Sequence, residues 1–303
     1  MILGEQQRHN QRLGMSMTLI GGLLLTVDAP LLRLAQTDSW TIILIRGVFA
    51  FSAMLAFWVL FQRGRKGSSP FVNGYLSVFI SCLTAIVSVM FVNAIQLTSV
   101  ANVVFLMAFN PMFAALLSWL FLGERQSTAT LLAILAAFGG VSIIVWDSVN
   151  IGNPLGDFLA LGVSLTLAVI LTIVRRSGTD QSMSPAFGSL MAAMAVIGFS
   201  SPGSLEVASW GWLALNGLIV IPLSSALLML GPRYIAAPVV AMFFLLETVL
   251  TPVWMWLIFN EVPTVRSMIG GVVIVLALLA HSIWSLKSKG TAGFAGLQRQ
   301  AAE

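Results

Sequence analysis

Charged residues are scarce in this chain. Of its 303 residues, 15 are Lys or Arg and 11 are Asp or Glu, which together make up 9%, whereas a soluble domain carries about a quarter. Hydrophobic residues make up 58%, and a soluble fold of this length cannot bury that much apolar surface in one core. The composition therefore excludes an ordinary soluble enzyme, a disordered protein and a nucleic-acid-binding protein.

Cysteine and histidine are scarcer still. The single cysteine, Cys82, can form neither an intramolecular disulfide nor a zinc site. The two histidines are far apart: His9 lies in the polar N-terminal tail and His281 near the end of the last apolar segment. The chain also lacks a Gly-rich Walker loop, which excludes an ATP-driven pump within it. We expect no metal, no cofactor and no catalytic residue, because an enzyme in the membrane needs a nucleophile with a base, a metal cluster or paired acids.

The hydrophobic residues fall into ten apolar segments of about 20 residues, the length that crosses a bilayer core of roughly 30 Å. These segments cover residues 14–34, 40–61, 73–95, 99–122, 129–147, 156–175, 183–200, 210–231, 236–260 and 266–286. Because the connecting loops are short, the sequence predicts an all-α integral membrane protein with ten transmembrane helices in one bundle.

Lys and Arg are unevenly distributed between alternate loops. If the N-terminus is cytoplasmic, the opposite side holds only Arg33 and Arg266, and Arg46 lies within a segment. The other basic residues then all lie on the cytoplasmic side: Arg8, Arg12, Arg63, Arg65, Lys66, Arg125, Arg175, Arg176, Arg233, Lys287, Lys289 and Arg299. Since positive charge favours the cytoplasmic side, we expect both tails, 1–13 and 287–303, to be cytoplasmic.

The two halves of the chain resemble each other. The stretch from Asn110 to Glu124 matches the stretch from Glu247 to Glu261, and Trp119 aligns with Trp256. The sequence therefore predicts two repeats of five helices, residues 1–147 and 148–303. Because five is odd, the second repeat enters the membrane upside down, and inverted repeats are typical of secondary transporters.

These residues resemble those of a known family, the drug/metabolite transporter superfamily in its ten-span EamA-type branch. The likeness lies in the run from Pro111 to Glu124, in Gly156-Asp157 and Arg175-Arg176 at the two ends of the sixth segment, and in Leu246-Glu247. Thr248 stands where the family often has proline. The resemblance implies transport of small metabolites across a bacterial inner membrane, more often out of the cell than into it.

Two ionisable residues lie at the same depth in the first two segments. Asp28 is six residues before the end of its segment and Arg46 six residues after the start of the next, so each lies roughly 9 Å below the same surface. Ionisable groups inside a bilayer are costly and are candidates for function. One interpretation is a structural ion pair; the other is that Arg46 meets a substrate carboxylate or Asp28 a substrate amine.

Glu247 lies near the middle of the ninth segment, and its repeat mate Asn110 near the middle of the fourth. Inverted symmetry places both close to the midplane, where transporters bind substrate. A desolvated carboxyl can carry a proton or a substrate ammonium across the membrane; the structural alternative is a hydrogen bond to a neighbouring helix backbone or to Arg46. Asn216 in the eighth segment is a lesser candidate.

Four prolines lie inside predicted segments: Pro30, Pro111, Pro222 and Pro252. Each leaves the carbonyl four residues earlier without its helical partner. Those freed by Pro111 and Pro252 belong to Met107 and Thr248, which flank Asn110 and Glu247 in the chain. We expect Met107 and Thr248 to line a polar cavity or to mark a kink that packing requires.

The sequence favours a secondary transporter that exports small metabolites such as amino acids from a midplane site between the repeats. The alternative is a proton-coupled exporter of drugs or organic cations that uses Glu247 as the exchanging acid; an importer, a receptor, a scaffold and a membrane-embedded enzyme are less favoured. The predicted partners are a small-molecule substrate, the lipid bilayer and protons, with no nucleic acid. No feature of the sequence specifies an oligomeric state.

Overall fold

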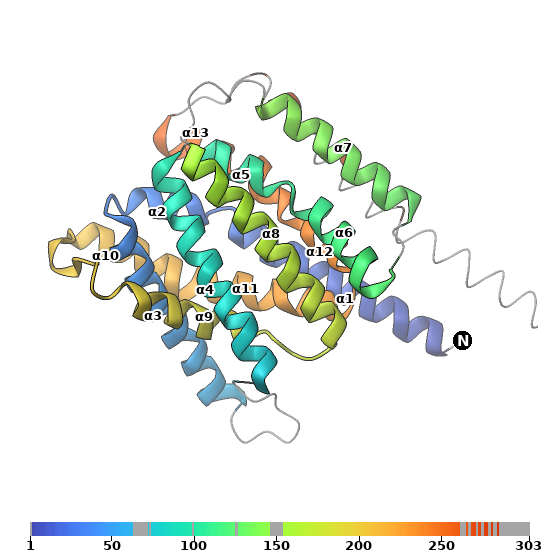
Figure 1. The fold of residues 1–303 in the computed structure, drawn as a ribbon, viewed down its shortest axis with the longest axis horizontal. Coiled ribbons are helices and arrows are strands. Elements are labelled where there is room, and N and C mark those ends of the chain that lie inside the picture. Colours follow the sequence, from blue (N-terminus) through green and yellow to red (C-terminus); the bar gives the residue numbers. More distant parts are fainter. Residues whose placement is uncertain are drawn as a thin grey trace, which may run out of the picture.

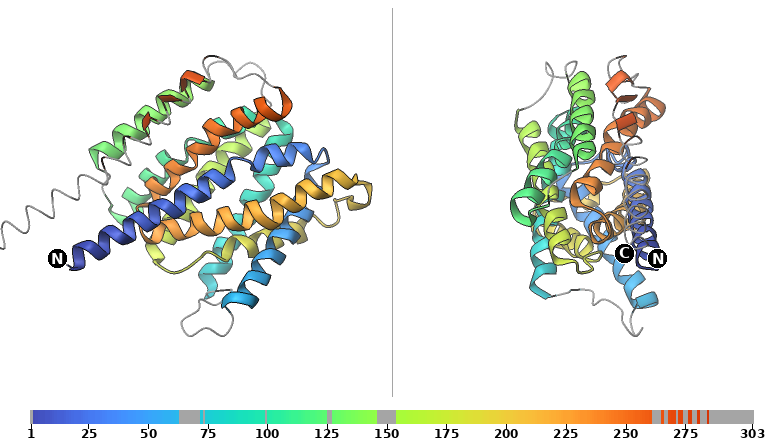
Figure 2. Two further views of the ribbon diagram at one scale, coloured as in Figure 1. Left: turned by 180° about the vertical axis from the view of Figure 1, so that it is seen from behind. Right: turned by 90° about the vertical axis from the view of Figure 1, so that its right-hand side faces the viewer.

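The chain forms one helical bundle. The computed structural model describes residues 2–62, 72, 74–98, 100–124, 127–145 and 154–260, and isolated positions at 265, 268–270, 272–273, 276–277, 280 and 284. All regular structure in these residues is helical, as the sequence predicts. In Figure 2, α1 (Ile2–Leu25) and α13 (Leu245–Phe259) lie on one side of the bundle, and α6 (Asn110–Leu122) and α8 (Pro154–Ser177) lie on the other.

The other elements connect these helices (Figure 1). They are α2 (Asp28–Leu34), α3 (Ser39–Phe57), the π-helix η1 (Trp58–Gln62), α4 (Gly74–Leu97), α5 (Val100–Met107), α7 (Thr128–Val145), α9 (Ser184–Val196), the 3-10 helix η2 (Pro202–Ser204), α10 (Val207–Leu215), the π-helix η3 (Asn216–Val220), α11 (Ile221–Leu230), the 3-10 helix η4 (Gly231–Arg233) and α12 (Ala237–Phe243).

Among the described residues, six helical stretches are long and apolar enough to cross a membrane. They cover residues 10–34, 39–61, 74–97, 154–177, 207–233 and 237–259. Three shorter apolar helices, at 110–122, 128–140 and 184–196, fall within other predicted segments. The predicted segment 266–286 lies largely outside the described residues, as do Arg266 and Glu261. Large apolar side chains cover the outside of the bundle, for example Leu60 and Phe158, which are 74% and 72% exposed.

The helices run between two ends of the bundle. We call the end with the α2–α3 connection, residues 35–38, the vestibule end, and the end with the α8–α9 connection, residues 178–183, the strap end. α4 runs from the strap end, where Ser77 bonds Gln181, to the vestibule end, where the Gln96 amide bonds the Thr37 carbonyl. The same contacts show that α3 and α4 cross the bundle in opposite directions.

Three helical segments break inside the bundle. The breaks fall at Thr26–Val27 between α1 and α2, at Ala108–Phe109 between α5 and α6, and at Phe244 between α12 and α13. The first two precede Pro30 and Pro111, which cannot donate to the helix before them. The breaks before α6 and α13 both lie just before the matching stretches, which begin at Asn110 and Glu247.

Side-chain hydroxyls from other helices bond the carbonyls at these breaks. Thr251 donates to the carbonyl of Thr26 at 3.1 Å, and Ser164 donates to the carbonyl of Met107 at 3.4 Å. These are two of the carbonyls that prolines were expected to free, and both accept a hydrogen bond from another helix. A polar backbone group left alone in lipid costs several kcal/mol, so these bonds allow the helices to break.

The two matching stretches also end alike. Gly123 follows α6 with φ 66° and Asn260 follows α13 with φ 55°, and both are left-handed caps. Glycine and asparagine are the residues that adopt this conformation most readily. α6 ends at the strap end, where Glu124 pairs with Arg175, whereas α13 ends at the vestibule end, where Arg33 lies 5.6 Å from the Phe259 ring.

α4 and α9 pack closely because glycine is present at the contact. A Cβ atom on Gly188 would lie 2.5 Å from the carbonyl oxygen of Ser81 and 2.8 Å from the Thr84 side chain. Small residues allow such close approach between membrane helices. Ser81 also donates to the carbonyl of Ser184 at 2.8 Å, so one face of α4 is fixed against the start of α9.

We expect Gly188→Ala to destabilise the protein by about 1–3 kcal/mol, the usual cost of an added methyl group in a tightly packed site. The measurement is thermal unfolding of the purified protein in detergent. Gly198→Ala is the matched control, because a Cβ at Gly198 meets no atom within 4 Å. Equal melting temperatures for the two variants would contradict the close packing of α4 and α9.

Candidate functional site

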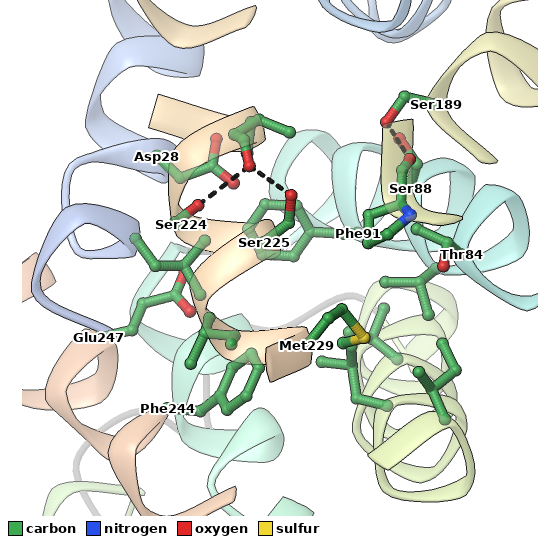
Figure 3. Close-up of a pocket in the computed structure, with 18 of the residues that line it drawn as sticks. Asp28, Thr84, Ser88, Phe91, Ser189, Ser224, Ser225, Met229, Phe244 and Glu247 are labelled. Carbon is green, nitrogen blue, oxygen red and sulfur yellow. Dashed lines mark hydrogen bonds between the residues drawn. The ribbon is translucent and has the colours of Figure 1, made fainter. Parts of the chain in front are cut away.

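A cavity of about 110 Å³ lies between the two sides of the bundle (Figure 3). Leu25, Asp28 and Glu247 line it from α1, α2 and α13, and Ser88 and Val163 line it from α4 and α8. Further lining comes from α3, α5, α9, α11 and the break at Phe244. The cavity therefore lies where the broken helices meet the intact ones.

Asp28 and Arg46 form an ion pair at the edge of this cavity. Arg46 Nη2 lies 2.8 Å from Asp28 Oδ2, and the two side chains are 9% and 2% exposed, respectively. This confirms the ion-pair interpretation of their common depth, and it also shows that both residues line the cavity. A buried pair is stable only with good geometry and further hydrogen bonds.

Asn216 supplies one of those bonds. Its amide donates to Asp28 Oδ1 at 2.7 Å, so both carboxylate oxygens of Asp28 have a partner. Asn216 begins the π-helix η3, which comes before Pro222. π-helical turns are rare and frequent at functional sites. From the sequence Asn216 was only a lesser candidate; the signal for its role was a lone amide in an apolar segment, six residues before a proline.

Glu247 lies in the first turn of α13 and is 2% exposed. Within the described part of the chain, its Oε1 atom is buried without a hydrogen-bond partner, and so is Nη1 of Arg46. Both residues line the cavity. One carboxyl oxygen and one guanidinium nitrogen, both buried, therefore border the same small space, and neither is bonded by the described helices around it.

The rest of the wall combines aromatic side chains with hydroxyl groups. The guanidinium of Arg46 lies 5.8 Å from the centre of the Phe91 ring, a distance suited to a cation–π contact. Ser224 and Ser225 donate to the carbonyl of Ile221 at 3.2 and 2.6 Å, as Figure 3 shows. Ser189 likewise donates to the carbonyl of Pro185 at 2.9 Å. Hydroxyl groups with satisfied protons can still accept hydrogen bonds from a ligand.

Of the predicted site residues, four line the cavity and two do not. Met107 joins Asp28, Arg46 and Glu247 in the lining. Thr248 instead donates to the carbonyl of Val104 at 2.9 Å and connects α13 to α5. Asn110 is 1% exposed at the start of α6, and neither amide atom has a partner among the described residues.

A polar network closes the strap end. Gln181 Oε1 accepts hydrogen bonds from the hydroxyls of Ser77 and Ser184 at 2.6 and 2.7 Å. The preceding residue, Asp180, lies 3.2 Å from Arg233 of η4. Residues 178–183 are therefore bonded to α4 on one side and to η4 on the other, beyond the cavity residue Pro185.

A second, larger chamber of about 600 Å³ lies at the vestibule end, and we call it the vestibule. Its lining includes Arg33, Thr37, Asp38 and Gln96. Asp38 caps α3 by accepting a hydrogen bond from the Thr41 amide at 2.9 Å. Partial burial raises the pKa of Asp38, but the bonds with Thr41 and with the backbone lower it more, to below the ordinary 3.8. Asp38 is therefore ionised at neutral pH.

The sequence matches one family model in both halves. The model describes the EamA-like transporter family and covers residues 3–146 and 154–283. The chain belongs to the EamA-like transporter family. A relative in Synechocystis sp., the uncharacterized transporter sll1164, is 25% identical over 234 residues, which is 69% of this chain and 67% of that protein. One solved crystal structure matches 89% of this chain, and 98% of its own length, with a TM-score of 0.72 at 14% identity, and this shows a shared fold.

Family and structure agree on the general character of the protein. The family is one of transporters, and six of the described helical stretches are long and apolar enough to span a bilayer. The protein is therefore an integral membrane transporter. Its partners are the lipid bilayer, which the outer apolar side chains contact, and a small-molecule substrate.

We expect Arg46→Met to destabilise the protein by about 3–5 kcal/mol, because it leaves the Asp28 carboxylate buried without its cation. In the double variant with Asp28→Asn, the loss is expected to be smaller than the sum of the two single losses. The measurement is a double-mutant cycle on unfolding in detergent. Additive losses would contradict the energetic coupling of the pair. Arg176→Met, at an exposed position in the last turn of α8, is the control and should cost under about 1 kcal/mol.

Proposed function

We propose that this transporter exports small metabolites such as amino acids by alternating access, and that the 110 Å³ cavity is its substrate site. The observation that carries the proposal is the pair of buried, unsatisfied groups of opposite character, Arg46 Nη1 and Glu247 Oε1. A zwitterion complements both, because its carboxylate accepts from Arg46 and its ammonium donates to Glu247. Charge-assisted bonds of this kind are about twice as strong as neutral ones.

The size of the cavity favours a small substrate. Its volume of about 110 Å³ is somewhat below the roughly 150 Å³ of an apolar cavity that holds one benzene molecule. Drug-sized ligands occupy pockets of about 300–1,000 Å³. In this conformation the cavity therefore fits a molecule with only a few non-hydrogen atoms.

The two halves supply the symmetry that alternating access needs. The breaks before α6 and α13, and the left-handed caps after them, correspond in the two matching stretches, and the two helices end at opposite ends of the bundle. This supports two inverted repeats of five helices, 1–147 and 148–303, with residues 266–286 as the tenth helix. Two similar arrangements, each open to one side, follow from such symmetry.

The distribution of Lys and Arg assigns the orientation within this proposal. With both tails in the cytoplasm of a bacterial cell, the strap end faces inward and the vestibule end faces outward across the inner membrane. Basic residues at the strap end include Arg175, Arg176 and Arg233, as the positive-inside rule requires. Export then proceeds from the strap end towards the vestibule.

A proton-coupled exporter of organic cations is the second candidate. It is favoured by the apolar part of the wall, which includes Phe91, Met229 and Phe244, because aromatic and thioether groups suit an apolar cation. In that case Glu247 exchanges a proton for the cation. Arg46 argues against it, because an unsatisfied guanidinium N–H repels a cationic substrate.

We expect Glu247→Gln to keep the fold and to reduce transport by at least about 100-fold, the effect of losing one charge-assisted bond of roughly 3 kcal/mol. The measurement is counterflow of labelled amino acids and organic cations, each tested separately, in proteoliposomes. Glu206→Gln is the matched control, since Glu206 is exposed and lies outside the cavity lining.

The panel of solutes separates the two candidates. Counterflow of a zwitterionic amino acid that is lost in Glu247→Gln and kept in Glu206→Gln supports the first. Counterflow of organic cations alone supports the second. Unchanged transport in Glu247→Gln would show that this residue is not part of the substrate site. If the wild type shows no counterflow of any solute, the proposed substrate class is wrong.

A further inference from the structure

The vestibule and the cavity lie along the same faces of the same three helices. On each helix, a residue that lines the cavity and a residue that lines the vestibule lie four positions apart. On α2 these are Asp28 and Leu32, and on α3 they are Arg46 and Ile42.

The third helix repeats the pattern. On α4, Ser88 lines the cavity and Val92 lines the vestibule. Four positions are about one helical turn, or roughly 5–6 Å along the axis. The two chambers are therefore adjacent along all three helices, and on α4 the neighbouring residues Phe91 and Val92 line the cavity and the vestibule, respectively.

Only one layer of side chains separates them. Leu32, Ile42 and Val92 are 2%, 1% and 1% exposed, although each borders the vestibule. They belong to one buried hydrophobic cluster. The vestibule residues that lie nearer its mouth are open, since Arg33, Gln36, Asp38 and Gln96 are all exposed. The apolar layer thus forms the floor of the vestibule directly beyond the Asp28–Arg46 ion pair.

The polar groups of the vestibule are already used locally. Gln96 donates to the carbonyl of Thr37 at 2.9 Å, Asp38 caps α3, and Arg33 lies over the ring of Phe259. A solute in the vestibule would find few groups in need of a partner, in contrast to the cavity. This chamber is suited to passage and not to tight binding.

Another opening in the bundle has a different character. A pocket of about 410 Å³ lies between α3, the end of the α8–α9 connection, η3 and α11, and its lining, which includes Phe57, Leu218 and Leu223, is almost entirely apolar. These three side chains are 43–47% exposed on the outside of the bundle. Such a surface faces lipid chains and offers no partner to a charged solute, so a polar substrate leaves the cavity by the vestibule.

We propose that the cavity and the vestibule are two chambers of one translocation path, and that Leu32, Ile42 and Val92 form the gate between them. This inference rests on the proposed function as a transporter of small polar solutes. When α2, α3 and α4 part by one side-chain layer, a solute moves from the unsatisfied groups at Arg46 and Glu247 to the open vestibule. When the layer closes, it excludes water from the ion pair.

Thiol reactivity tests the gate without any transport assay. In a Cys82→Ala background, which removes the native thiol, single cysteines are placed at Ile42 and at Ile43, and a small methanethiosulfonate reagent is added to the purified protein. Both isoleucines are 1% exposed on α3, but only Ile42 borders a chamber. We expect Ile42→Cys to react about tenfold faster or more, because it meets water whenever the gate opens locally.

A second pair of cysteine variants, on α4 and α5, tests the gate in case a variant of the first pair does not fold. Val92→Cys should react faster than Val103→Cys, since Val103 is equally buried in the same cluster and borders neither chamber. Thr37→Cys in the open vestibule is the positive control. Equal, slow reaction of both members of each folded pair would overturn the gate.

Transport gives an independent readout. Ile42→Ala removes most of one side chain from the gate layer, so we expect severalfold faster counterflow of amino acids with larger side chains. The matched Ile43→Ala loses comparable core packing and should show no such gain. If the wild type transports amino acids and Ile42→Ala and Ile43→Ala transport them at the same rate, the proposed gate is wrong. If the wild type transports nothing but Ile42→Cys still reacts faster than Ile43→Cys, the path stands and the proposed substrate class is wrong.

Discussion

A bilayer offers no hydrogen-bond partner to a broken helix, and the architecture of this protein follows from that constraint. Three of its helical segments break next to the cavity, and the polar backbone left at the breaks is bonded by side chains from other helices. Thr251 bonds the carbonyl of Thr26, Ser164 that of Met107, and Thr248 that of Val104 in the last full turn of α5. Because these bonds cross between elements far apart in sequence, the breaks also hold the bundle together.

The breaks place charge at the cavity. Asp28 and Glu247 lie in the first turns of α2 and α13, where the free backbone amides of a helix favour a negative group. Asp28 is fully engaged by Arg46 and Asn216, whereas Glu247 Oε1 has no hydrogen-bond partner among the described residues. In the proposed function, the first acid is part of the scaffold and the second binds a substrate or a proton. The proposed site thus combines a rigid frame with a small number of unsatisfied groups.

The closures at the two ends of the bundle differ in chemistry. At the strap end, Gln181 and Asp180 bond hydroxyl and guanidinium groups, and water can replace such bonds at little cost. At the vestibule end, the proposed gate layer of Leu32, Ile42 and Val92 covers the buried Asp28–Arg46 ion pair. Opening this layer exposes both apolar side chains and the ion pair to water. In the proposed alternating-access mechanism, two closures of unlike chemistry respond differently to a bound solute, so that one end can open at a time.

Composition and periodicity determined that this chain spans a membrane as helices, because burial of 58% hydrophobic residues has no solution in water. Equal depth on consecutive segments was enough to predict the Asp28–Arg46 pair, since depth follows from residue count at 1.5 Å per residue. Sequence could not predict which polar residues face the cavity: Thr248 has the same character as Thr84 and Ser224, which line it, and only the rotation of each helix about its axis separates them. That rotation is set by close contacts such as those at Gly188 and by the π-helical turn before Pro222. The cavity, its unsatisfied groups and the apolar layer between the cavity and the vestibule were therefore decided by the tertiary structure alone.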